Sequence, residues 1–174
     1  YDVSCMFSWG DNDNYEYEIL TSKYYDEHRR ILLEKLENTN YKVIKREAGK
    51  RIPQQEFYGN MYNSKITTAP IGYGEMAVRD IEAAAFGSVL LKPDMSYIDS
   101  KPFLYEDGET YIACKYDWSD VEDKIDYILS NYKELQPYLV ENMRKRFLEE
   151  YSNEKFVLHI YNIFKNMDEV YVES

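Results

Sequence analysis

Gly72, Tyr73 and Gly74 form a turn between a β-prone run and a helical stretch, and this turn is the part of the sequence best suited to chemistry. Glu75 falls in the first turn of the helix predicted at residues 75–86. Glycines permit positive φ angles and let a ligand approach the backbone closely. The N-terminus of a helix adds unpaired backbone N–H groups and the positive end of the helix dipole. A turn of this kind is therefore suited to binding an anion.

The elements that must position this turn form one strand–helix–strand unit. Residues 65–69 are β-prone, Gly87 is placed to end the helix with a left-handed cap, and residues 88–91 form a continuous apolar run. Such a run is typical of a strand that is buried on both faces of a parallel sheet. Open parallel sheets bind their ligands at the carboxyl edge of the strands. The turn is therefore predicted to lie at the ligand-binding edge of a sheet.

Arg79 and Glu82 are three residues apart and share one face of the predicted helix. The string R-x-x-E-A-A-x-x-G that begins at Arg79 is followed by the apolar strand, by Asp94 and by Pro102-Phe103. In this order, the motifs resemble the C-terminal, nucleotide-sugar-binding half of GT-B glycosyltransferases, in particular exostosin-like and spore-protein-like members. The resemblance covers residues 64–131 in its motifs and extends more loosely over the whole chain.

The resemblance implies a role for each part of the motif. Glu82 matches the family's glutamate that accepts hydrogen bonds from both ribose hydroxyls, and an ion pair with Arg79 is the alternative for this residue. The turn from Gly72 to Glu75 matches the loop that approaches the diphosphate and the sugar. In retaining members, two glutamates are separated by one residue more than the six that lie between Glu75 and Glu82, so the role of Glu75 and the stereochemical outcome stay open.

Arg29 is a second arginine with a predicted role in binding phosphate. It lies on the apolar stripe of a helix predicted at residues 22–38, close to the helix end that faces the carboxyl edge of the sheet. The forked guanidinium suits bidentate contact with a phosphate. The alternative is that the basic residues of this helix only pair with its acidic residues. The full set of predicted donor-binding residues is Glu82, Arg79, Glu75, Gly74, Tyr73, Gly72, Arg29, Arg30 and Asp94, with Lys23 as a further phosphate ligand.

Composition excludes several other classes of protein. The net charge of −11 argues against a general nucleic-acid-binding surface, which requires clustered Lys and Arg. Cys5 and Cys114 are too few for a disulfide framework or a metal cluster and are predicted to be buried, reduced thiols. The longest apolar stretch, residues 83–91, is too short to span a membrane. The D-x-D string at residues 11–13 is interpreted as an acidic surface loop, so no metal and no other cofactor is expected.

Residues 1–174 are predicted to form a single Rossmann-like α/β domain of three layers. A parallel sheet of five or six strands in the order 3-2-1-4-5 is expected, closed by two C-terminal helices. The predicted strands are residues 2–9, 41–47, 65–69, 88–91 and 110–116. The predicted helices are residues 22–38, 53–63, 75–86, 119–131, 132–151 and 153–167.

The predicted function is the donor-binding domain of a glycosyltransferase that moves a hexosyl or pentosyl group to an acceptor hydroxyl without a metal. The resemblance implies a UDP- or GDP-sugar donor, and a glycan or protein acceptor bound by an N-terminal half outside this chain. We expect a cytoplasmic protein, with any membrane attachment made by regions outside this chain. Two other classes stay open: a non-catalytic nucleotide-binding or interaction module of the same fold, and an NAD-dependent oxidoreductase domain. The oxidoreductase is opposed by the lack of G-x-G-x-x-G after the first strand.

Overall fold

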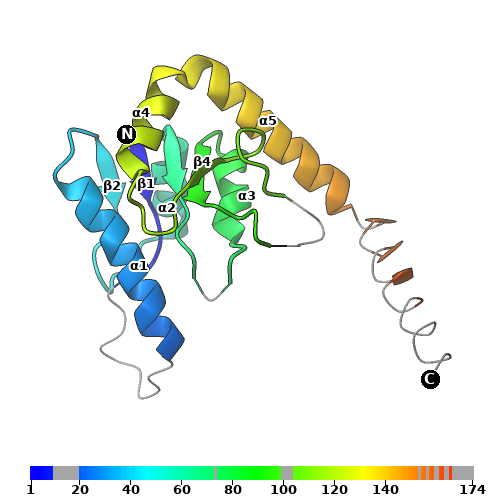
Figure 1. The fold of residues 1–174 in the computed structure, drawn as a ribbon, viewed down its shortest axis with the longest axis horizontal. Coiled ribbons are helices and arrows are strands. Elements are labelled where there is room, and N and C mark those ends of the chain that lie inside the picture. The colour runs from blue at the N-terminus through cyan, green and yellow to red at the C-terminus, as the bar shows by residue number, and fades with distance from the viewer. Residues whose placement is uncertain are drawn as a thin grey trace.

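The computed structural model describes residues 1–9, 20–72, 74–98 and 104–152, together with residues 154–155, 157–158, 161–162 and 165. Five parallel strands form one sheet with helices on both faces (Figure 1), which confirms the predicted α/β class. The strands are β1 (Val3–Cys5), β2 (Val43–Lys45), β3 (Ile66–Thr68), β4 (Val89–Pro93) and β5 (Ile112–Cys114). The helices are α1 (Leu20–Glu37), α2 (Gln54–Tyr62), α3 (Val78–Ala85), α4 (Val121–Ser130) and α5 (Tyr132–Glu150).

The order of the strands is β2-β1-β3-β4-β5, so the predicted order 3-2-1-4-5 was wrong about β3. β3 lies between β1 and β4, whereas the predicted order placed it at the edge beyond β2. Every residue of β3 is buried, but the residues of β2 are only half-buried or exposed. A short strand that ends in a lysine suits the edge of a sheet, and a fully buried strand suits its interior. The strand order therefore reverses between β1 and β3.

Buried hydroxyl groups connect the three central strands. Ser4 on β1 and Thr67 on β3 have their side-chain oxygens 3.0 Å apart, and the Thr67 hydroxyl lies 2.7 Å from that of Ser88, just before β4. The Ser4 hydroxyl also lies 3.3 Å from the carbonyl oxygen of Ile66. Because buried hydroxyls need partners, this chain of hydrogen bonds favours β3 as the neighbour of both β1 and β4.

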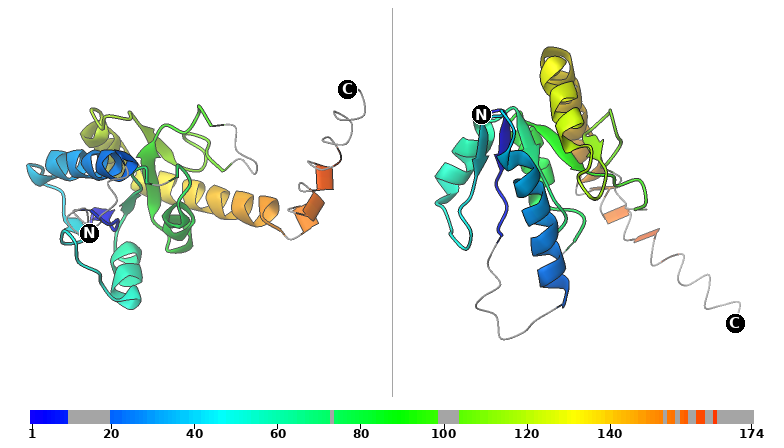
Figure 2. Two further views of the ribbon diagram at one scale, coloured as in Figure 1. Left: turned by 90° about the horizontal axis from the view of Figure 1, so that it is seen from below. Right: turned by 60° about the vertical axis from the view of Figure 1, so that its left-hand side comes forward.

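Helices cover the sheet on both sides (Figure 2). α1 and α4 lie on one face, α2 and α3 lie on the other, and α5 packs along α3 and continues past the edge of the sheet. The apolar core accordingly has two parts. Leu32, Leu36, Ile125, Ile128 and Trp118 fill the first face, and Met61, Ala83, Ala84, Leu90 and Met143 fill the second.

The helix after the glycine turn is shorter than predicted. It begins at Val78, because Ala77 has an extended backbone and its N–H donates to Asp80 Oδ2 at 3.1 Å. Glu75 therefore lies before the helix, not in its first turn. Gly87 follows the helix with a φ of 79°, which confirms the predicted left-handed cap.

The remaining helices agree closely with the predicted ranges. Of the helix predicted at residues 153–167, the described residues are helical. Across the described part of the chain, no helix combines the length and the apolar composition needed to cross a bilayer.

Candidate functional site

The site predicted from the sequence lies at the carboxyl edge of the sheet, where the strand order reverses. The chain leaves β3 at Thr68, passes through the turn at Gly72 and Gly74, and enters α3 at Val78. In sheets of this kind, the crevice outside the carboxyl ends at the reversal point is the usual place for a ligand. Tyr73, one of the predicted site residues, lies outside the described residues.

Arg29 reaches this edge from α1. Its Nη1 donates a hydrogen bond to the carbonyl oxygen of Ser8, just after β1, at 2.9 Å. The guanidinium also lies against the glycine turn, because a Cβ added at Gly72 would come within 2.7 Å of Arg29 Nη2. Gly72 is therefore needed for close approach of the arginine, a use of this glycine that the sequence did not reveal.

Arg79 reaches the same strand end from α3. Its Nε donates to the carbonyl oxygen of Met6 at 3.0 Å, and its guanidinium carbon lies 5.9 Å from the centre of the Phe7 ring. The pKa of Arg79 is lowered to about 10, chiefly by burial. The positive charges of Arg29 and Arg46 act in the same direction, and the nearby carboxylates oppose them. At neutral pH the group remains a cation, and it is held in place by a neutral carbonyl.

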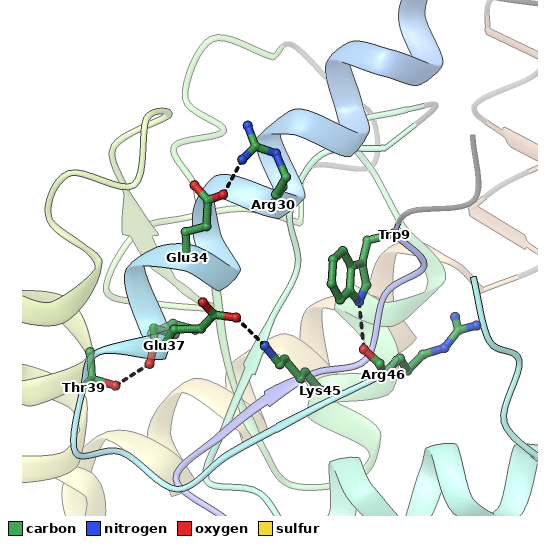
Figure 3. Close-up of polar contacts among 8 residues, drawn as sticks. Trp9, Arg30, Glu34, Glu37, Thr39, Lys45 and Arg46 are labelled. Atoms are coloured by element: carbon green, nitrogen blue, oxygen red, sulfur yellow. Dashed lines mark hydrogen bonds and ion pairs between the residues drawn. The ribbon is translucent and has the colours of Figure 1, made fainter. Parts of the chain in front are cut away.

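Arg46 is a third arginine at this position, and sequence reasoning missed it. Its Nη1 donates to the hydroxyl of Ser8 at 2.8 Å, and its carbonyl oxygen accepts from Trp9 Nε1 at 2.8 Å (Figure 3). Arg46 directly follows β2 and so lies at the carboxyl end of a strand. This position is the feature of the sequence that could have indicated Arg46 as a site residue. We call Arg29, Arg46 and Arg79 the arginine cluster.

All three side chains of the arginine cluster donate to neutral acceptors at the end of β1. Met6 and Ser8 receive hydrogen bonds from all three side chains through backbone carbonyls and one hydroxyl. Within the described part of the chain, Arg46 and Arg79 form no ion pair with a carboxylate. A concentration of positive charge is thus kept in a chain whose net charge is −11. Such a cluster suits phosphate oxygens, which arginine binds bidentately.

Glu82 is half-buried on α3, one helical turn after Arg79. Its charge is close enough to raise the pKa of Arg79, yet no ion pair joins the two side chains. Among the described residues, Glu82 has no hydrogen-bonding partner, so its carboxylate oxygens are available to a ligand. Glu75 is exposed at the end of the turn, and its carbonyl oxygen accepts a hydrogen bond from Lys92 Nζ at 2.5 Å.

Arg30 and Asp94 do not join the cluster. Arg30 is exposed and pairs with Glu34, as Figure 3 shows, and with Glu27 at 4.0 Å, which are the ion pairs that the alternative interpretation of this residue expects. Asp94 follows β4 and lines a separate hollow of about 650 Å³. The side chain of Lys23 and the D-x-D string at residues 11–13 lie outside the described part of the chain.

A buried charged network supports the glycine turn from beneath. Lys92 on β4 and Asp80 on α3 are fully buried, with Nζ and Oδ2 3.2 Å apart. The same carboxylate accepts a hydrogen bond from the Tyr105 hydroxyl. Because Lys92 also binds the carbonyl of Glu75, the network links the turn, α3 and β4. The sequence contained a signal for it, a lysine within an otherwise apolar strand.

His28 on α1 is buried beside the end of β5. Its Nε2 lies 2.8 Å from the carbonyl oxygen of Tyr116, and its ring stacks on Tyr116 with the centroids 4.7 Å apart. Burial lowers the pKa of His28, and the hydrogen bond to Tyr116 opposes this effect. The imidazole is therefore a neutral packing group at neutral pH.

Comparisons with known proteins give no further information on the site. The sequence matches no protein-family model, and no curated protein is similar enough to count as a match. Among the described residues, no group of three or more His, Cys, Asp or Glu side chains is arranged to hold a metal ion.

Proposed function

We propose that this chain is the donor-binding domain of a glycosyltransferase that uses a nucleotide-sugar. The observation that carries the proposal is the arginine cluster at the point where the strand order reverses, with Glu82 one helical turn into α3. A nucleoside diphosphate needs positive charge for its phosphates and acceptors for its ribose hydroxyls. The cluster and Glu82 supply these two features side by side.

The same arrangement suits the chemistry of glycosyl transfer. When the bond between the sugar and the diphosphate breaks, negative charge develops on the leaving phosphate oxygens. Fixed cations stabilise that charge without reorganisation, because Arg29 and Arg79 are already held by backbone carbonyls. The proposed transfer moves a hexosyl or pentosyl group from UDP or GDP to an acceptor hydroxyl and draws its positive charge from arginines, not from a metal. The acceptor would be held by an N-terminal half outside this chain.

The test is isothermal titration of the chain with UDP, GDP, pyrophosphate and NAD. Glu82→Gln preserves shape but replaces a charged acceptor, so UDP or GDP affinity is expected to fall about ten- to a hundredfold. Pyrophosphate, which has no ribose, is expected to bind this variant as it binds the parent. Arg79→Lys is expected to weaken the binding of both the nucleotide and pyrophosphate, since it removes the forked guanidinium donors while keeping the positive charge.

Arg30→Ala is the matched control, because this arginine lies on the surface and pairs with Glu34. It is expected to change neither the affinity for UDP or GDP nor the affinity for pyrophosphate. Thermal unfolding of each variant shows whether its fold is intact. Binding of NAD but not of UDP or GDP would support the oxidoreductase instead. Failure of all four ligands to bind would support a non-catalytic interaction module. If Glu82→Gln binds the nucleotide as tightly as the parent, the assignment of Glu82 is wrong.

A further inference from the structure

Four tyrosines gather at the carboxyl edge of the sheet, beyond the arginine cluster. The rings of Tyr24 and Tyr116 are stacked with centroids 6.4 Å apart, and those of Tyr24 and Tyr25 meet edge to face at 5.8 Å. Tyr97 belongs to the same group, because it lines one hollow together with Tyr116. Burial raises the pKa of Tyr97, and Glu75, Asp94, Tyr24 and Tyr25 raise it further. We call Tyr24, Tyr25, Tyr97 and Tyr116 the tyrosine group.

Much of the aromatic surface of the tyrosine group is exposed to solvent. The exposed fractions of Tyr24, Tyr97 and Tyr116 are 53%, 62% and 40%. Exposed apolar surface gathered in one place generally marks a site of interaction, whereas scattered exposed residues do not. Tyr97 and Tyr116 also line the hollow of about 650 Å³, which is the size of a small-molecule site.

Tyr116 is backed by a rigid stack. His28 lies under the ring of Tyr116 at 4.7 Å, and the fully buried Trp118 lies 5.2 Å from His28. The hydrogen bond between His28 Nε2 and the Tyr116 carbonyl fixes the backbone as well. A ring held in this way loses little freedom when a ligand stacks on it, which favours binding.

The polar lining of the hollow consists chiefly of carboxylates held by backbone groups. Asp107 Oδ1 accepts from the Ala113 N–H and Asp120 Oδ1 from the Lys115 N–H, each at 2.8 Å. Asp94 Oδ1 is held in the same way by the N–H of a neighbouring serine at 2.9 Å. These bonds orient the carboxylates while each retains further acceptor positions. A ligand of this hollow must therefore bring hydrogen-bond donors.

The charge of the lining limits the ligand further. The three carboxylates are offset by Lys115 and Lys124, so the hollow has no excess of positive charge with which to hold a phosphate. Flat, exposed rings suit the apolar C–H face of a pyranose, and oriented carboxylates suit its hydroxyls. We infer that the hollow beside the tyrosine group binds a neutral carbohydrate. The inference stands on these residues alone and does not require that the arginine cluster bind a nucleotide.

The experiment is a titration of the chain with neutral trisaccharides, observed by saturation-transfer NMR and quantified by calorimetry. The probes are maltotriose, cellotriose, xylotriose, mannotriose and the trimer of N-acetylglucosamine. We expect at least one to bind in the millimolar range or tighter. Tyr97→Ala is expected to weaken that binding at least about tenfold, because loss of an aromatic stacking partner typically has an effect of this size.

Tyr62→Ala is the matched control, since Tyr62 is 70% exposed on α2 on the opposite face of the sheet. It is expected to leave trisaccharide binding unchanged. Arg79→Lys is also expected to leave it unchanged, so failure of the nucleotide proposal and failure of the carbohydrate proposal are distinguishable. If none of the probes binds at up to about 20 mM, or if binding survives Tyr97→Ala and Tyr116→Ala together, the inference is overturned.

Discussion

Gly72 shows at the residue scale why the site depends on more than its charged groups. The absent side chain leaves the space in which the Arg29 guanidinium lies, so the position of a cation on α1 is set by a glycine after β3. These two residues are far apart in the sequence, and either alone would be read as ordinary. Together they determine where one arginine of the cluster stands relative to the strand ends.

The substitution Gly72→Ala is therefore expected to move Arg29 without unfolding the protein. The added Cβ would lie 2.7 Å from Nη2, which is the mobile end of a flexible side chain. We expect pyrophosphate affinity to fall about tenfold, or ~1.4 kcal/mol of binding free energy, because the displaced guanidinium no longer lies where the phosphate would bind. The Arg29 Nε–H resonance should shift in ¹H–¹⁵N spectra whether or not ligand is present.

Gly59→Ala on α2 is the control for this substitution, because a Cβ there would meet no atom within 4 Å. It should stabilise the fold by ~0.5–1 kcal/mol, since alanine is the better helix former. Neither the Arg29 resonance nor pyrophosphate affinity should respond to it. An unshifted Arg29 resonance in Gly72→Ala would show that the contact is not made.

At the scale of elements, α3 and β4 are joined by the buried pair of Asp80 and Lys92. Both side chains are 0% exposed, and Tyr105 and the Ala77 N–H donate to the same carboxylate. Burial lowers the pKa of Lys92 while Asp80 opposes that effect. An arrangement like this contributes little net stability when complete, but it is costly to leave half-formed. It therefore fixes the start of α3, and with it the turn, against β4.

Lys92→Met is expected to destabilise the protein by about 3–5 kcal/mol in urea unfolding, because it leaves the Asp80 charge buried and unpaired. The double variant Lys92→Met with Asp80→Asn should lose less than Lys92→Met alone, since no unpaired charge remains. The same change at the surface pair of Lys65 and Asp2, Lys65→Met, should cost under about 1 kcal/mol. Additive losses in the double variant would mean that the two buried groups do not interact.

At the scale of the whole molecule, the two cysteines can serve as probes of how readily two strands of the sheet become exposed to solvent. Cys5 lies on the interior strand β1 and Cys114 on the edge strand β5, and both are buried. Burial raises the pKa of Cys5 to about 11 and that of Cys114 to about 12. Because the thiolate is the reactive form, neither thiol should react while the sheet is closed.

Labelling with a maleimide at about pH 8 should therefore be limited by opening of the structure. We expect Cys5 to be modified more slowly than Cys114, because an interior strand is exposed only by global unfolding, whereas an edge strand opens locally. Mass spectrometry of Cys114→Ala and Cys5→Ala follows each thiol separately. The prediction fails if Cys5 in folded protein is modified at the rate measured for the urea-denatured chain.

Local sequence patterns were enough to predict the class of fold and the position of the glycine turn. The apolar run at residues 88–91 and the cap at Gly87 describe neighbours along the chain. The structure confirms the cap and a buried strand at this place, with the strand running over Val89–Pro93. The start of α3 was placed too early, because a hydrogen bond from the Ala77 N–H to the Asp80 carboxylate, not the glycine, decides where the helix begins. Short patterns such as the apolar run and the helix cap depend only on the backbone preferences of a few adjacent residues.

Only the tertiary structure decided which strand ends and which side chains meet. The place of β3 depends on how deeply it is buried relative to β2, and this is a comparison between distant segments. The packing of these segments places Arg46 in the cluster, where it contacts Ser8, and places Arg30 on the surface, where it pairs with Glu34. The same packing brings the tyrosines of α1 beside those that follow β4 and β5, and so forms the tyrosine group. Hydrophobic periodicity gives each segment an inward face, but pairing between segments determines which residues those faces bring together.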